Sequence, residues 1–226
     1  EEIYNARVDC GYEIFNLLVS EAFVFFKNAF PAFKDVPERE RDLIFKDYLG
    51  KFSTVDGYYR TRQTWGEVKH YMMCSVVTCY DRDRFNRLDS IAKEKQGDAK
   101  FMLSSARMFS GDQSALVLPV FNRSNITDKE FYALVALVMS ELDSGCTVSE
   151  QALTILDRYR SDTLEALQTY YQDELELANF STRLGNLMSL SHAIQECKSL
   201  HKVFFRFHST FFDSYTINEA LKNLFL

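Results

Sequence analysis

The chain has 226 residues, of which 46% are hydrophobic and 15% aromatic, and its formal net charge is −6 at pH 7. This length and apolar content suffice for one large core, so we expect a single domain over residues 1–226. The acidic balance argues against nucleic-acid binding through a general basic face, because phosphate contact requires clustered Lys and Arg. Only eight Gly and three Pro interrupt the chain, which predicts an all-α fold.

Five cysteines at scattered positions are typical of reduced thiols in an intracellular protein rather than of a disulfide framework. Only Cys74 and Cys79 are close in sequence, and no second Cys or His pair accompanies them, so we predict no metal site and no cofactor. No apolar run reaches the length needed to span a membrane. The chain begins without Met, from which we expect a fragment whose amino-terminal partner domain is missing.

The first predicted helix lies within residues 8–33, where apolar side chains occupy nearly every face. Such a segment is expected to be buried on several sides, sandwiched between other helices. The second helix is predicted to begin at Asp35, Pro37 and Glu38, which combine an N-cap, an early Pro and an acidic first turn. Its apolar side is formed by Leu43, Ile44, Tyr48, Leu49 and Phe52.

Residues 72–80 are rich in β-branched and aromatic side chains, which predicts a short strand or hairpin. Residues 81–111 are charged and poorly periodic. We therefore expect a short helix and loops there.

Two capping boxes predict the next helix starts. Thr127 and Glu130 have the spacing at which a hydroxyl and a carboxylate satisfy two amide donors of the first turn, and Thr147 and Glu150 repeat this spacing. Apolar residues at three- and four-residue steps follow each box, so each is expected to open an amphipathic helix.

A helix of about thirty residues is predicted to begin at Ser181 or Thr182, because apolar residues recur at helical spacing as far as Phe211. A helix this long usually crosses a whole domain, and its outer face can serve as a dimer seam. The predicted seam residues are Arg183, Leu187, Leu190, Ile194, Cys197 and Leu200.

The carboxyl-terminal segment predicts a short capped amphipathic helix. Thr216 and Glu219 form a capping box, and one apolar face follows at helical spacing, with Ile217, Ala220, Leu221, Leu224 and Phe225. So short a helix is held only by docking of that face. It is therefore either a ligand-operated lid or a terminal element that closes the core.

Catalytic motifs are not evident. The four histidines are scattered, and we find no Gly-rich phosphate loop, nucleophile elbow or paired-His metal motif. We therefore predict that the chain is not an enzyme.

Three stretches together resemble a known family. Residues 21–46 are similar to the signature of the ligand-binding domain of nuclear hormone receptors, with an aromatic residue, Lys27, a Phe six residues later, and an acidic residue before paired apolar residues. Residues 183–205 resemble its long tenth helix, and residues 221–225 lie where its activation helix belongs. The resemblance is specifically to the divergent group expanded in nematodes, and the stretches occur in order over nearly the whole chain.

The resemblance implies a three-layer antiparallel helical sandwich with one small β-hairpin, and a lipophilic pocket in its lower half, operated by the terminal helix. It further implies a fatty acid or sterol as ligand, a zinc-finger DNA-binding domain upstream, dimerisation through the long helix and a location in the nucleus. Two functional hypotheses stay open. The chain is a ligand-binding and transactivation domain that recruits coactivator or corepressor helices, or a ligandless (orphan) dimerisation and scaffold domain whose pocket is filled by aromatic rings.

The resemblance also implies a coregulator groove for a short LxxLL helix. Its implied residues are Phe23, Lys27, Arg41, Phe45 and Lys46, completed by Leu221, Asn223 and Leu224 of the activation helix, which comprises Ile217, Glu219, Ala220, Leu221, Leu224 and Phe225. Two positions depart from the family pattern. Asn223 replaces the clamp carboxylate, and Asp42 falls where the groove is normally apolar. We therefore expect weak or atypical coactivator recruitment.

Overall fold

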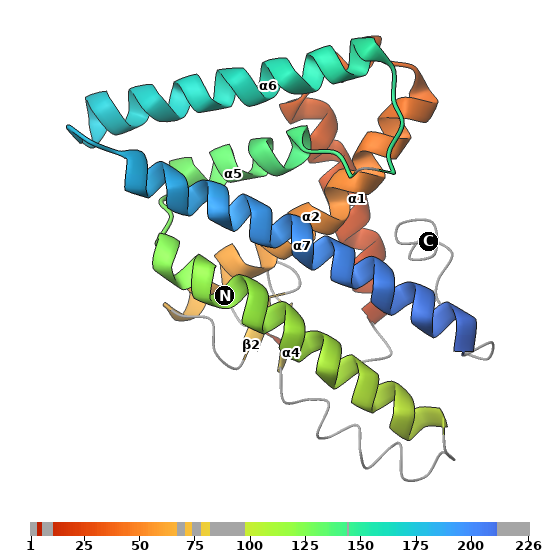
Figure 1. The fold of residues 1–226 in the computed structure, drawn as a ribbon. Helices are drawn as coiled ribbons and strands as arrows, with labels where there is room; N and C mark the ends of the chain where they lie inside the picture. The colour runs from red at the N-terminus through yellow and green to blue at the C-terminus, as the bar shows by residue number, and fades with distance from the viewer. Residues whose placement is uncertain are drawn as a thin grey trace.

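The computed structural model describes residues 4–5, 11–66, 71–73, 78–81, 98–143 and 145–211, which fold into helices and one small sheet (Figure 1). The helices are α1 (Gly11–Ala29), the 3-10 helix η2 (Pro31–Asp35), α2 (Glu38–Trp65), α4 (Asp98–Ser124), α5 (Asp128–Ser140), α6 (Glu150–Thr169), the π-helix η3 (Tyr170–Glu174) and α7 (Ser181–Phe211). The strands are β1 (Tyr4–Asn5), β2 (Tyr71–Met73) and β3 (Thr78–Asp81).

The described helices lie in three layers, as the sequence predicts. α2, α5 and α6 form the middle layer, α1 packs against α2 on one side, and α4 and α7 form an antiparallel pair on the other (Figure 1). The helix predicted from residue 181 is confirmed, since α7 runs for 31 residues across the domain.

The predicted hairpin is also confirmed. β2 and β3 are antiparallel, with Met72 opposite Tyr80, and β1 adds a short parallel strand on the other side of β3.

α1 is less buried than its sequence suggests. It packs mainly through one face, on which Ala22 and Phe26 are almost inaccessible, whereas Leu17 and Val24 are more than half exposed. The prediction that this helix is buried on several sides, between other helices, is therefore wrong for residues 17–29, whose side-chain burial the structure describes. No described helix is long and apolar enough to cross a membrane.

The connection between α1 and α2 is a 3-10 turn rather than a capped helix start. Pro31 opens η2, and Asp35 is its last residue, so Asp35 is not the N-cap of α2. Pro37 precedes α2 without any side-chain cap. The prediction of an Asp35 cap is wrong because the fixed φ angle of Pro31 starts a tight turn first, and this turn ends in extended backbone at Val36.

α4 is much longer than the short helix predicted within residues 81–111. Its helix begins at Asp98 and continues past Pro119, although a proline inside a helix removes one backbone donor. Val117 and Phe121 are each about 1% exposed in the core, and Ser124 Oγ donates to the backbone oxygen of Asn186 on α7 at 3.2 Å. Tertiary packing against α7 therefore overrides the weak local pattern.

Glu130 joins α5, η3 and α7. The predicted capping box is confirmed, because the Thr127 amide donates to Glu130 at 2.8 Å and the Glu130 amide donates to the Thr127 hydroxyl at 3.3 Å. Arg183 contacts both carboxylate oxygens of Glu130 at 2.6 Å, and the Tyr171 hydroxyl donates to it at 2.8 Å. Burial alone would raise the pKa of Glu130, but these bonds outweigh it and lower the pKa below 4.5.

The start of α6 lies two residues later than the sequence predicts. Ser149, not Thr147, is the N-cap, and its hydroxyl accepts from the Ala152 amide at 3.3 Å. Glu40 of α2 accepts from the amide and the hydroxyl of Ser149 at 3.0 and 2.6 Å. This long-range contact selects the cap, and no local pattern contains it.

We predict that Glu130→Gln lowers the free energy of unfolding by about 2–3 kcal/mol, because it leaves the guanidinium of Arg183 without its charge partner. Urea unfolding followed by circular dichroism measures the change. Lys129→Ala is the matched control on the same turn, since Lys129 and Glu174 form an exposed pair expected to contribute less than about 1 kcal/mol.

The contribution of Glu130 to the free energy of unfolding also depends on pH. The folded-state pKa of Glu130 is lowered, so its stabilisation is complete above pH 4.5 and is lost as the pH falls through the folded-state pKa. Glu130→Gln should therefore destabilise the protein less at acidic pH than at pH 7. An equal effect at both would contradict the assignment.

Candidate functional site

A groove of about 320 Å³ lies between the end of α1, η2 and the first turns of α2. Aromatic rings form its floor, and charged side chains form its rims. The lining residues are Phe23, Phe26, Lys27, Phe30, Pro31, Phe33, Lys34, Glu38, Arg41 and Asp42.

The floor of the groove is rigid because its rings pack on one another. Phe26 and Phe33 stack with their centroids 5.4 Å apart, and Phe26 also contacts Tyr48 of α2 at 5.7 Å. Phe23 lies at the edge of the groove, 40% exposed, with its ring edge-to-face against Phe45 at 5.0 Å. The groove therefore presents an apolar surface that is fixed before any partner binds.

The two rims differ in charge. We name the rims by the elements that carry them: Lys27 of α1 and Lys34 of η2 form one rim, and Glu38 and Asp42 of α2, with the half-buried Arg41 between them in sequence, form the other. The Lys27 ammonium lies 5.4 Å from the centroid of the Phe23 ring. None of the five charged side chains forms an ion pair or hydrogen bond with another residue in the described ranges.

The structure brings together three of the predicted groove residues. Phe23, Lys27 and Arg41 line the groove, Phe45 lies beneath Phe23, and Lys46 is exposed but does not line it. Leu221, Asn223, Leu224 and the other activation-helix residues, Ile217, Glu219, Ala220 and Phe225, lie outside the described residues.

Sequence reasoning did not assign six of the lining residues to the groove: Phe26, Phe30, Pro31, Phe33, Lys34 and Glu38. Phe26, Phe30 and Phe33 recur at spacings of four and three residues, a signal that could have revealed the floor. No sequence spacing indicates that Lys34 lines the groove, because the position of its side chain depends on the turn that η2 makes.

Residues 3–211 match the sequence model of the ligand-binding domain of nuclear hormone receptor. The chain belongs to this family. Its members are ligand-regulated transcription factors rather than enzymes, and the predicted family and fold are thereby confirmed.

The fold agrees with a solved structure of the family. The ultraspiracle ligand binding domain from Drosophila melanogaster matches with a TM-score of 0.54 and 15% identity, over 97% of this chain and 84% of that one. This identity is low, so the likeness concerns the fold alone. No curated protein matches the sequence.

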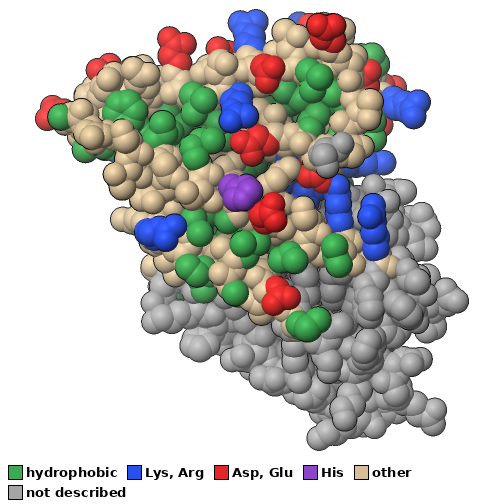
Figure 2. All heavy atoms as spheres, in the orientation of Figure 1, with side chains coloured by type: hydrophobic (Ala, Val, Ile, Leu, Met, Phe, Trp, Pro, Cys, Tyr) green, Lys and Arg blue, Asp and Glu red, His purple; other side chains and the backbone are tan. Residues whose placement is uncertain are grey.

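The predicted dimer seam of this nuclear receptor domain needs correction. Leu187, Leu190, Ile194 and Cys197 are each about 1% exposed or less, because they face the core of their own chain, and Arg183 is engaged by Glu130. Leu200 is half-buried. After the first turn of α7, the residues that the structure describes as exposed recur at four- and three-residue steps on the opposite face: Gly185, Ser189, His192, Glu196, Ser199, Val203 and Arg206. Figure 2 shows the side of the molecule on which α7 lies, where apolar and charged side chains are interspersed.

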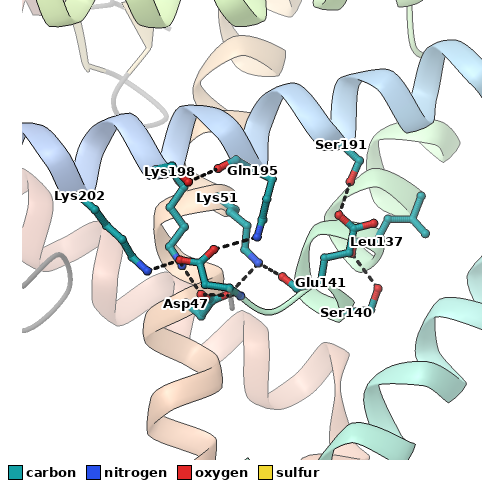
Figure 3. Close-up of polar contacts among 11 residues, drawn as sticks. Asp47, Lys51, Leu137, Ser140, Glu141, Ser191, Gln195, Lys198 and Lys202 are labelled. Atoms are coloured by element: carbon teal, nitrogen blue, oxygen red, sulfur yellow. Dashed lines mark hydrogen bonds and ion pairs between the residues drawn. The ribbon is translucent and has the colours of Figure 1, made fainter. Parts of the chain in front are cut away.

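Behind the groove, a buried charged cluster connects α2, the α5–α6 turn and α7 (Figure 3). Asp47 of α2 pairs with Lys51 at 2.6 Å and with Lys198 of α7. Lys198 also pairs with Asp143 at 3.0 Å, and Asp143 pairs with Lys202. The Asp47, Lys51 and Lys198 side chains are at most 5% exposed, so their charges are stabilised by one another rather than by water.

Burial changes the pKa of Lys51. Desolvation lowers this pKa below its ordinary value of 10.5, although the charge of Asp47 opposes the shift. The ammonium also donates to the backbone oxygen of Glu141 at the end of α5. Three segments of the domain are thus held by one carboxylate and two buried lysines.

We predict that Asp47→Asn lowers the free energy of unfolding by about 3–5 kcal/mol, because Lys51 and Lys198 then lose their shared carboxylate. Chemical denaturation is the measurement. Lys202→Ala is the comparison variant in the same cluster, and because Lys202 is about one-third exposed, we expect it to cost about 1 kcal/mol or less. A loss of under 1 kcal/mol for Asp47→Asn would contradict the structural role of the cluster.

Proposed function

We propose that this chain is the ligand-binding and transactivation domain of a nuclear hormone receptor that recruits coregulator helices through the α1–α2 groove. The observation that carries the proposal is the aromatic groove with Lys27 at its rim, where Lys27 forms no ion pair with any residue that the structure describes. In keeping with the family, the receptor would act in the nucleus and contact DNA through a separate zinc-finger domain.

The groove suits a short amphipathic helix. The apolar ridge of such a helix would bury itself on the Phe23 and Phe26 rings, and Lys27 would interact with the carbonyl end of the helix dipole. Leu221 and Leu224 of the predicted activation helix would complete the groove. Asn223 supplies no charge for the amide end of the bound helix, so recruitment would be weaker than with a carboxylate there.

A lipophilic ligand of the fatty acid or sterol class would control recruitment. It would shift the terminal helix toward its docked position, provided that it binds better when that helix is docked.

A ligandless dimerisation and scaffold domain is the alternative function. Dense aromatic packing in the described core favours it, since Phe26 contacts the rings of Phe30, Phe33, Phe45 and Tyr48. In this case the partner chain would contact the exposed face of α7, through residues such as His192 and Val203 rather than through the buried leucines.

We predict that an LxxLL peptide binds the domain with a Kd above about 1 μM, and that Lys27→Ala weakens it about fivefold. Asn223→Glu should strengthen binding by a similar factor, because it supplies the missing clamp carboxylate. Fluorescence anisotropy measures all three. Submicromolar binding by the unaltered chain, lost in Lys27→Ala, would show that the carboxylate is dispensable, and an unchanged Kd in Lys27→Ala would contradict the groove.

Native mass spectrometry separates the two functions. For a ligand-binding domain we expect a releasable adduct of a few hundred daltons, the size of a pocket ligand. The mass of the denatured protein is the control, because it shows whether any added mass is covalently attached. A bare homodimer with no adduct, also after incubation with a fatty acid mixture, would favour the scaffold function.

A further inference from the structure

The charge arrangement of the groove indicates which helices it accepts. Glu38 and Asp42 are one helical turn apart on α2, and both are exposed and lack an ion-pair partner among the described residues. Lys27 and Lys34 belong to the other rim, which α1 and η2 contribute. A helix docked in the groove would therefore meet lysines contributed by α1 and η2 and carboxylates contributed by α2.

We propose that the groove selects an amphipathic helix carrying two Lys or Arg residues, one turn apart, on the flank that faces Glu38 and Asp42. This inference rests on the proposed function of the groove and names the chemistry of its partner. Side chains four residues apart on a helix are neighbours, so the spacing of the two carboxylates matches two basic residues of a docked helix.

Selection follows from the cost of removing charge from water. A docked helix with only apolar side chains on this flank would desolvate two carboxylates without replacing their water contacts. Basic side chains would replace those contacts with ion pairs. Arg41 lies between the two carboxylates in sequence, is half-buried and bonds to neither of them. It adds one positive charge to this rim, so two basic residues of a docked helix would face a net charge of −1.

A purely structural role accounts for only one of the two carboxylates. Glu38 is the first residue of α2, where a negative charge stabilises the amino-terminal end of the helix dipole. Asp42 lies beyond the first turn, where that effect has fallen off. A role in binding explains both positions.

Peptides of one length with the same apolar ridge test the proposal by anisotropy titration against the 226-residue chain. One carries two Lys residues one turn apart on the first flank of the ridge, a second carries them on the other flank, and a third carries Gln at both. We expect the basic peptide whose lysines face Glu38 and Asp42 to bind about five- to tenfold tighter than the Gln peptide. The other basic peptide should bind no tighter than the Gln peptide, because its lysines face away from the two carboxylates.

The double variant Glu38→Gln/Asp42→Asn should abolish the preference, so that it binds the basic peptides and the Gln peptide with equal affinity. Glu150→Gln/Asp157→Asn is the matched control, since it makes the same charge change on exposed positions of α6, starting likewise at the first residue of the helix. The control should retain the full preference. Thermal unfolding of both variants reports any structural effect separately.

Equal affinity of all three peptides for the unaltered chain, with binding still weakened by Lys27→Ala, would overturn the selection while leaving the groove function intact. A preference that survives in Glu38→Gln/Asp42→Asn would also overturn it. If no peptide binds at all, and Lys27→Ala changes nothing, the proposed function fails together with this inference.

Discussion

Asp47 holds the middle of this domain in place. Its carboxylate is buried on α2 and pairs with Lys51 of the same helix and with Lys198 of α7, so it links the two helices through ion pairs that are shielded from water. The α5–α6 turn joins the cluster through Asp143 and the backbone oxygen of Glu141. The position of α2 relative to both α5 and α7 is thus set by electrostatics as well as by apolar packing.

The groove on the other side of α2 depends on that position. Phe45 and Tyr48 lie within one turn of Asp47, and their rings contact Phe26 of α1. The floor of the groove is therefore continuous with the core, and only its rims are open to a partner. Buried charges on one side of α2 are fully paired, whereas the exposed charges at the groove have no partner in the described chain. This contrast is the physical basis for assigning structure to the first set and recognition to the second.

Local chemistry predicted several elements correctly, and long-range contacts explain the failures. The Thr127–Glu130 box and the α7 periodicity each involve residues within a few positions of one another, so the pattern is visible in the sequence. Ser149 was missed as a cap because Glu40, more than a hundred residues earlier, holds it there. The seam prediction failed for a related reason. Leu187 and Leu190 are apolar at helical spacing, and this pattern cannot say whether the apolar face meets the chain's own core or a second chain.

The sequence by itself determined the largely helical fold, the receptor family and the helix starts at Thr127 and Ser181. These follow from periodicity, capping and motif, which act over a few neighbouring residues. Only the tertiary structure decided the turn at Pro31 that brings Lys34 to the groove, the lack of an ion-pair partner for Glu38 and Asp42 among the described residues, and the burial of Lys51 and Lys198. Each of these depends on contacts between residues that are distant in sequence. Burial and ion pairing arise from such contacts, so no local stretch of sequence reveals them.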